Sequence, residues 1–150
     1  MPQSFGALYL HIIFSTKNRL PIITPEIQSR LYGYLGGILS HRKCVQLAAG
    51  GIPDHIHLLV SLARDLSISD CIRDIKSLAS GWVHETFPRS DNFAWQSGYA
   101  AFSVSYSSLD AVRAYIANQA EHHRGKTFQE EYLDFLQRHE MEYDERYMWD

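Results

Sequence analysis

The sequence predicts an α+β protein built on a four-stranded antiparallel sheet. Four segments have the short apolar or alternating pattern of strands, and two longer segments between them repeat apolar residues at helical spacing. Their order is strand, helix, strand, strand, helix, strand, and two further helices are expected over about residues 108–124 and 127–139. This order is typical of the ferredoxin-like, or split βαβ, arrangement with two crossover helices on one face of the sheet.

The first half of the pattern begins with strict alternation over residues 7–15, where His11 falls on the face opposite Leu10 and Ile12. The helix that follows, within 24–43, begins with Thr24 as a candidate N-cap and a proline at its first position. Short apolar runs then predict strands over residues 44–51 and 55–62, separated by a Pro-Asp turn.

The second half repeats this pattern. Residues 67–87 carry an apolar stripe at helical spacing, and residues 98–107 predict the fourth strand. The first and third strands are then neighbours at the centre of the sheet. Alternation in the third strand directs Ile56 and Leu58 to the core and sends His55 and His57 to the other face, where His11 also lies.

Length and composition indicate one globular domain over residues 1–150. No apolar run approaches the roughly 20 residues that span a bilayer, and the first residues lack the pattern of a signal peptide. Cys44 and Cys71 have no motif spacing and are expected to be reduced thiols, so a cytoplasmic location without a membrane association is expected.

The charge is distributed unevenly. Residues 1–129 contain 12 Lys and Arg against 9 Asp and Glu, whereas residues 130–150 contain 2 against 8. The acidic segment is expected to pack on the body or face solvent and not to contact nucleic acid. The basic body offers candidates for contacts with a phosphate backbone, although solvated surface positions are the simpler interpretation of each; these candidates are Lys17, Arg19, Lys76 and Arg124.

The pair His55-x-His57 is weak evidence by itself, since about 0.4 such pairs are expected by chance in a chain with eight histidines. Two nitrogens are also an incomplete metal site. Tyr115 and Gln119 stand four residues apart in the next-to-last helix, on the same face. An amide at the margin of an apolar stripe needs a hydrogen-bond partner or a metal ion.

Taken together, these residues carry a resemblance. The blocks HIIFSTKNR, GGIPDHIHLLVSL, IKSLASGW, WQSGYAAFSVS, YIANQAEHHRGKTFQEEYLDFL and YDERYMWD, in this order, resemble the HUH single-strand DNA transposases that have one catalytic tyrosine, the small transposases of insertion sequences. The resemblance extends over nearly the whole chain. It implies that Tyr115 is the nucleophile, that His55 and His57 bind a metal ion, and that Gln119 is the third ligand.

The resemblance also implies an activity and its partners. Two imidazoles and an amide oxygen leave open positions that suit Mg²⁺ or Mn²⁺, and the ion would polarise a phosphate oxygen. Attack by Tyr115 on single-stranded DNA with hairpin ends would give a 5′-phosphotyrosine link and a free 3′-OH, from which strands can be rejoined. Since two cleavages need two tyrosines, a homodimer is expected, and Tyr115 could act in its own or in its partner's site.

Three alternatives stay open at this point. A domesticated relative that acts on repeated genomic hairpins would share the same four residues. A ferredoxin-like module could bind single-stranded nucleic acid without cleaving it, its histidines contacting phosphate. A hydrolase could use the histidines to activate water, with Tyr115 in a structural role.

Overall fold

The sheet has the predicted topology. The structure is a computed structural model that describes residues 2–149, and its strands run in the order β2-β3-β1-β4 with every neighbouring pair antiparallel. The first and third strands are paired at the centre, as expected. The strands are β1 (Tyr9–Ser15), β2 (Val45–Ile52), β3 (His55–Ser61) and β4 (Ala100–Val104). β4 is shorter than the segment predicted for it.

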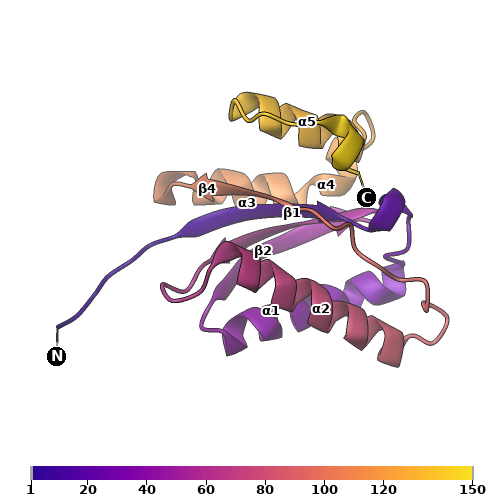
Figure 1. Cartoon of the computed structure of the whole chain (residues 1–150), viewed down its shortest axis with the longest axis horizontal. Helices are drawn as coiled ribbons and strands as arrows, with labels where there is room; N and C mark the ends of the chain where they lie inside the picture. Colours follow the sequence, from indigo (N-terminus) through magenta and orange to yellow (C-terminus); the bar gives the residue numbers. More distant parts are fainter. Residues whose placement is uncertain (1, 150) are drawn as a thin grey trace.

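Helices cover both faces of this sheet (Figure 1). The two crossover helices, α1 (Pro25–His41) and α2 (Ile68–Thr86), lie on one face. Side-chain oxygens cap both: Thr24 accepts a hydrogen bond from the Ile27 amide, and Ser67 accepts one from the Asp70 amide. The other face is covered by helices from the C-terminal third, namely α3 (Leu109–Ala117), α4 (Gln119–His122) and α5 (Phe128–Arg138).

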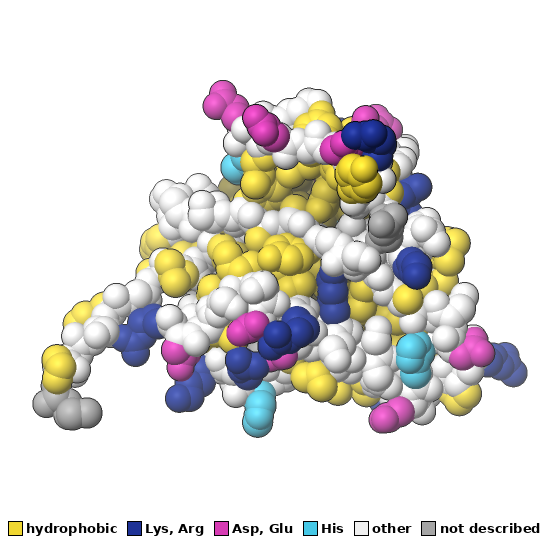
Figure 2. All heavy atoms as spheres, viewed as in Figure 1, with side chains coloured by type: hydrophobic (Ala, Val, Ile, Leu, Met, Phe, Trp, Pro, Cys, Tyr) yellow, Lys and Arg dark blue, Asp and Glu magenta, His cyan; other side chains and the backbone are white. Residues whose placement is uncertain are grey.

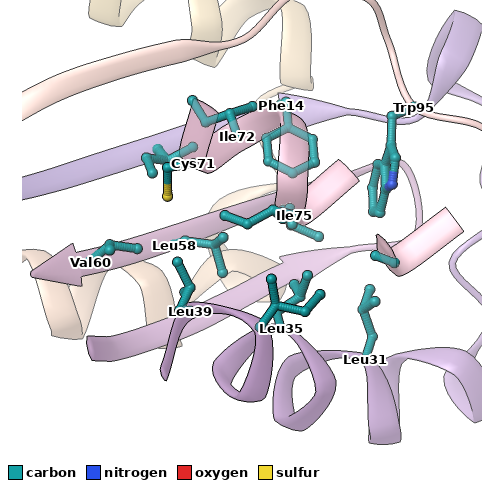
Figure 3. Packing of buried hydrophobic residues seen from close by; sticks show 14 of the residues in the cluster. Phe14, Leu31, Leu35, Leu39, Leu58, Val60, Cys71, Ile72, Ile75 and Trp95 are labelled. Carbon is teal, nitrogen blue, oxygen red and sulfur yellow. The ribbon is translucent and has the colours of Figure 1, made fainter. Parts of the chain in front are cut away.

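The main core lies between the sheet and the two crossover helices (Figure 3). Alternation directs every second strand residue into it, among them Ile12, Phe14, Ile56 and Leu58, and all four side chains are fully buried. The helices contribute their apolar stripes; the labelled side chains in Figure 3 include Leu31, Leu35, Leu39, Ile72 and Ile75.

The opposite face of the sheet packs in two smaller clusters. One joins Ile13 and Phe102 to α5 through Phe128 and Tyr132. The other joins Leu59 of β3 to α3, and includes Leu109 and Ile116. Most residues of the central strands that do not face the main core are therefore buried as well, and His11, His55 and His57 are among them.

The segment predicted as one helix over 108–124 is interrupted. α3 ends at Ala117, and Asn118 has φ −100° and ψ 23°, outside the helical range. Its amide bonds to the carbonyl oxygens of Ala114 and Tyr115, which closes the helix end. Tyr115 and Gln119 therefore lie on two short helices and are not one above the other on a single helix.

In Figure 2, several Asp and Glu side chains lie on the C-terminal layer at the top of the view, with Lys or Arg side chains beside them. Within residues 2–149, no helix is both long and apolar enough to cross a membrane.

Candidate metal centre and tyrosine site

His55 and His57 lie at the centre of the sheet and are inaccessible to solvent. Strand alternation places both on the face that α3, α4 and α5 cover, while Ile56 between them enters the main core. Nδ1 of His55 lies 2.7 Å from Oδ1 of Asp54, and Nδ1 of His57 lies 2.7 Å from Nε2 of His11. The Nε2 atoms of the two rings are left to face the C-terminal helices.

Three further side chains meet these Nε2 atoms. Oε1 of Gln119 lies 3.1 Å from Nε2 of His55. Oε1 of Glu131 lies 2.9 Å from Nε2 of His57 and 3.4 Å from Nε2 of His55. Nε2 of His123 lies 3.1 Å from both oxygens. All five side chains are buried, with exposed fractions between 0 and 3%.

These separations match the edges of a metal coordination sphere. Ligands bound at about 2.0–2.2 Å lie roughly 3.0–3.5 Å from one another. The donor atoms of His55, His57, His123 and Glu131 all lie within 4.8 Å of one another. The cluster therefore has the dimensions of a site that could hold a metal ion.

The hydrogen-bonding capacity of these groups also fits a cation. Nδ1 of His55 faces a carboxylate, and Nδ1 of His123 lies 2.6 Å from the carbonyl oxygen of Lys126, so both rings donate from Nδ1. A neutral imidazole then has only a lone pair at Nε2. Both Nε2 atoms nevertheless face the oxygens of Gln119 and Glu131, which are acceptors as well. Lone pairs that converge in this way need a proton or a metal ion between them.

The pKa values of His55, His57 and Glu131 are shifted because these side chains are buried against one another. Burial alone would lower the pKa of His55, but the Asp54 and Glu131 carboxylates outweigh it and raise that pKa. Burial lowers the pKa of His57 to about 4. Burial opposes ionisation of Glu131, yet hydrogen bonds with His123, His55 and His57 hold its pKa far below its ordinary value. Glu131 is therefore a carboxylate, and it supplies the negative charge of the cluster.

Tyr115 contacts the same carboxylate from the other side. Its hydroxyl donates to Oε2 of Glu131, whose Oε1 faces the histidines. Nε2 of His122 lies 3.1 Å from the same hydroxyl oxygen. Burial and the nearby Glu131 raise the pKa of Tyr115, so the hydroxyl is protonated at neutral pH. The carboxylate of Glu131 therefore joins Tyr115 to the histidine pair.

The structure thus brings together the four predicted residues His55, His57, Tyr115 and Gln119. It also places His123 and Glu131 in the cluster, and the sequence analysis did not predict these two. Neither His123 nor Glu131 was assigned a role. The signal for Glu131 was its position: it lies on the apolar face of α5 with Phe128, Tyr132 and Leu136, where a carboxylate is out of place unless it has partners.

The candidate DNA contacts have varied surroundings. Lys17 begins a short 3-10 turn and is exposed. Arg19 lies 5.6 Å from the ring centre of Trp149. Lys76 donates to the carbonyl oxygens of Gln96 and Gly98, at 2.8 and 2.6 Å. Arg124 pairs with the exposed Glu121 at 3.3 Å. Their contacts with DNA stay a prediction.

A split βαβ sheet with a His-hydrophobic-His pair on a central strand and one tyrosine on a following helix defines the single-tyrosine HUH class. The profile of the family described as "Transposase IS200 like" matches residues 4–119. The chain belongs to this IS200-like transposase family. The matched range includes His55, His57, Tyr115 and Gln119 and ends before His123 and Glu131.

Similar proteins agree with this assignment. The chain is 23% identical over 127 residues to the ISDra2 transposase TnpA of Deinococcus radiodurans, covering 79% of this chain and 91% of that protein. A crystal structure of a Deinococcus radiodurans protein assigned as a transposase superposes with a TM-score of 0.62 at 24% identity, over 79% of this chain and 98% of the other. A REP-associated tyrosine transposase bound to a REP hairpin gives 0.58 at 16% identity, over 79% and 70%. At these identities, the structural likenesses show the fold alone.

Proposed function

We propose that this chain cleaves and rejoins single-stranded DNA by metal-assisted transesterification, with Tyr115 as the nucleophile. The observation that carries the proposal is the shared carboxylate: Glu131 contacts the hydroxyl of Tyr115 through one oxygen and the histidine cluster through the other. A scissile phosphate that met the cluster would therefore lie beside the hydroxyl.

The reaction is a transesterification, in which one phosphoester bond replaces another. The Tyr115 hydroxyl oxygen bonds to phosphorus and the bond from phosphorus to the 3′ oxygen breaks, which leaves a 5′-phosphotyrosine link and a 3′-OH. The tyrosine proton moves to the acceptor that its hydroxyl already contacts, Oε2 of Glu131, and the protonated carboxyl gives a proton to the departing 3′ oxygen, so that the 3′-OH forms and Glu131 is again a carboxylate. A 3′-OH can attack the phosphotyrosine in the reverse step, which joins strands without ATP.

The proposed metal ligands are His55, His57 and Gln119, extended by His123 and Glu131. A bound Mg²⁺ or Mn²⁺ would polarise a phosphate oxygen and stabilise developing negative charge. The residues would offer the ion neutral donors and one carboxylate, a mixed nitrogen and oxygen set that suits Mn²⁺ somewhat better on softness grounds. In the six-fold coordination that these ions prefer, five protein donors would leave one position for a phosphate oxygen.

The proposed substrate is single-stranded DNA with hairpin ends. The ISDra2 transposase is a relative by sequence, and the REP-associated transposase, which shares the fold, is bound to a hairpin. The likeness to the hairpin-bound protein also keeps a second candidate: action on repeated genomic hairpins by a domesticated relative. The single domain over residues 1–150, the homodimer, the cytoplasmic location and the DNA contacts of Lys17, Arg19, Lys76 and Arg124 are parts of this proposal.

The test is incubation of the protein with single-stranded DNA that contains the flanking hairpins, in Mg²⁺ or Mn²⁺. A covalent protein–DNA adduct is expected, and it should be absent in Tyr115→Phe. Tyr106→Phe is a matched control, because Tyr106 is an exposed tyrosine before α3 that is not part of the described cluster.

Two outcomes would replace the proposal. Cleavage that survives Tyr115→Phe would favour a hydrolase in which water attacks. Binding of the hairpin with no cleavage in either metal would favour a non-catalytic module for single-stranded nucleic acid.

A further inference from the structure

His11 is a buried histidine that the proposed reaction does not use. It lies on β1, its ring is 3% exposed, and it points to the same face of the sheet as His57. In the β1–β3 register His57 pairs with Ile13, two residues beyond His11, so the two rings are diagonal neighbours on adjacent strands. Their ring centres are 5.0 Å apart.

A short hydrogen bond joins the two rings. Nε2 of His11 lies 2.7 Å from Nδ1 of His57, and within the described part of the chain this is the one hydrogen bond recorded at that nitrogen. Each ring nitrogen of an imidazole holds either a proton or a lone pair, and this bond joins two such nitrogens. One ring must donate in this bond and the other must accept.

The direction of the bond depends on what faces Nε2 of His57. With the Glu131 carboxylate as its partner, Nε2 of His57 donates, Nδ1 accepts, and Nε2 of His11 donates to it. A cation beside Nε2 of His57 requires a lone pair there, so the proton must sit on Nδ1. Nε2 of His11 must then accept, and the His11 proton must sit on its own Nδ1.

His55 differs in this respect. Its Nδ1 faces Asp54, a carboxylate that only accepts, so the Nδ1 proton stays in place and Nε2 is the nitrogen that remains for a cation. The Nδ1 of His57 faces no carboxylate. Its partner is Nε2 of His11, which can either donate or accept a hydrogen bond. Outer partners of this kind set the tautomer and ring orientation of metal-binding histidines.

We propose that His11 is a positioning residue for the metal centre: it accepts the Nδ1–H of His57 and thereby holds the Nε2 lone pair of His57 toward the cation. This inference rests on the metal site of the proposed function. Among the described residues, His57 is the one member of the cluster to which the His11 ring is hydrogen-bonded, so His11 acts through His57.

Its packing holds the ring in place. The edge of Phe135 meets His11 at 5.2 Å between ring centres, and Tyr115 lies 6.0 Å away. A variant whose side chain fills this space but has no hydrogen-bond acceptor therefore removes the hydrogen bond to His57 and keeps the packing. His11→Phe is that variant, with His11→Leu as a smaller substitute if the larger ring disturbs folding. His11→Gln restores an acceptor near the position of Nε2.

The experiment measures Mn²⁺ affinity by electron paramagnetic resonance of the free ion, together with ¹⁵N spectra of the histidines in metal-free and Mg²⁺-saturated protein. We expect His57 to carry its proton on Nδ1 when Mg²⁺ is bound. We expect His11→Phe to bind Mn²⁺ at least about tenfold more weakly and His11→Gln to bind within a few-fold of wild type. His139→Phe, which changes an exposed histidine at the end of α5 that stacks on Phe102, is the matched control.

The outcomes separate the two claims. If wild type binds Mn²⁺ and both His11→Phe and His11→Leu, folded by circular dichroism, bind it equally well, the inference is wrong and the metal site stands. If the wild-type chain binds neither Mn²⁺ nor Mg²⁺, the metal site of the proposed function is wrong, and the inferred role of His11 is wrong as well.

Discussion

Gly50 of β2 lies directly beneath the backbone of Ile116 in α3. A Cβ on Gly50 would overlap the carbonyl oxygen of Ile116 and would lie 3.0 Å from its Cγ2. Its φ is not positive, so the requirement for glycine is one of space and not of conformation. The residue before Ile116 is Tyr115, so this contact sets how closely the tyrosine approaches the histidines.

Gly50→Val should therefore displace α3 from the sheet. We expect adduct formation to fall at least about tenfold, since small misplacements of reacting groups have large effects, and stability to fall by about 1–3 kcal/mol from overpacking. Single-turnover cleavage and chemical denaturation measure the two effects. Gly81→Ala in α2 is the control, because no atom lies within 4 Å of the added Cβ. Full activity in Gly50→Val would contradict the role of this contact.

The sheet could be predicted from the sequence because the alternation of residues within each strand indicates which side chains face the main core. Alternation separated Ile56 and Leu58 from His55 and His57, and the strand order followed from the order of elements. The interruption at Asn118 could not be predicted in this way, since the apolar periodicity continues through it and the helix end depends on backbone hydrogen bonds.

Glu131 could not be predicted as a member of the cluster for a different reason. Residues 130–150 have a strongly negative net charge, and a net value conceals one carboxylate that turns inward. His122 and His123 are adjacent, and which of them faces the cluster depends on the rotation of α4 after the interruption. The His123 side chain is 3% exposed and that of His122 is 30% exposed, so His123 lies inside the cluster and His122 contacts Glu131 from its edge.

Glu131→Gln should weaken metal binding. The substitution keeps the shape of the side chain and removes the charge of the cluster, so we expect Mn²⁺ affinity to fall at least tenfold, about 1.4 kcal/mol. Because a ligand at about 100 times its Kd stabilises a protein by about 2.7 kcal/mol, the rise in Tm on adding Mn²⁺ should shrink in the variant. Glu121→Gln removes an exposed charge and is the control. An unchanged Mn²⁺ affinity in Glu131→Gln would exclude the carboxylate as a ligand.

Acid should destabilise the metal-free protein in a defined pH range. The pKa of His57 is lowered to about 4 and that of His11 to about 3, from an ordinary 6.5. Below pH 6.5 the unfolded chain binds protons at these rings that the folded chain does not. The free energy of unfolding should therefore fall with decreasing pH, by about 1.4 kcal/mol per pH unit for each ring. His55, whose pKa is raised, is protonated in both states below 6.5 and adds no slope there.

His11→Gln tests this pH dependence. Urea denaturation in a chelator at several values between pH 4.5 and 6 should give a slope smaller by about 1.4 kcal/mol per pH unit than that of wild type. His41→Gln, which changes an exposed histidine at the end of α1, is the control. Equal slopes in wild type and His11→Gln would show that His11 is not buried as a neutral ring.

The capping box at the start of α5 should control the metal site from a distance. The Thr127 side chain accepts from the Glu130 amide, and the Glu130 side chain accepts from the Thr127 amide, which fixes the first turn of the helix that carries Glu131. Thr127→Ala should cost about 1 kcal/mol of stability and weaken Mn²⁺ binding several-fold, because a frayed first turn no longer holds Glu131 beside His57. Ser67→Ala removes the equivalent cap from α2, on the other face of the sheet, and should cost a similar stability without changing Mn²⁺ affinity. Equal effects of the two variants on Mn²⁺ affinity would mean that the position of Glu131 does not depend on its helix end.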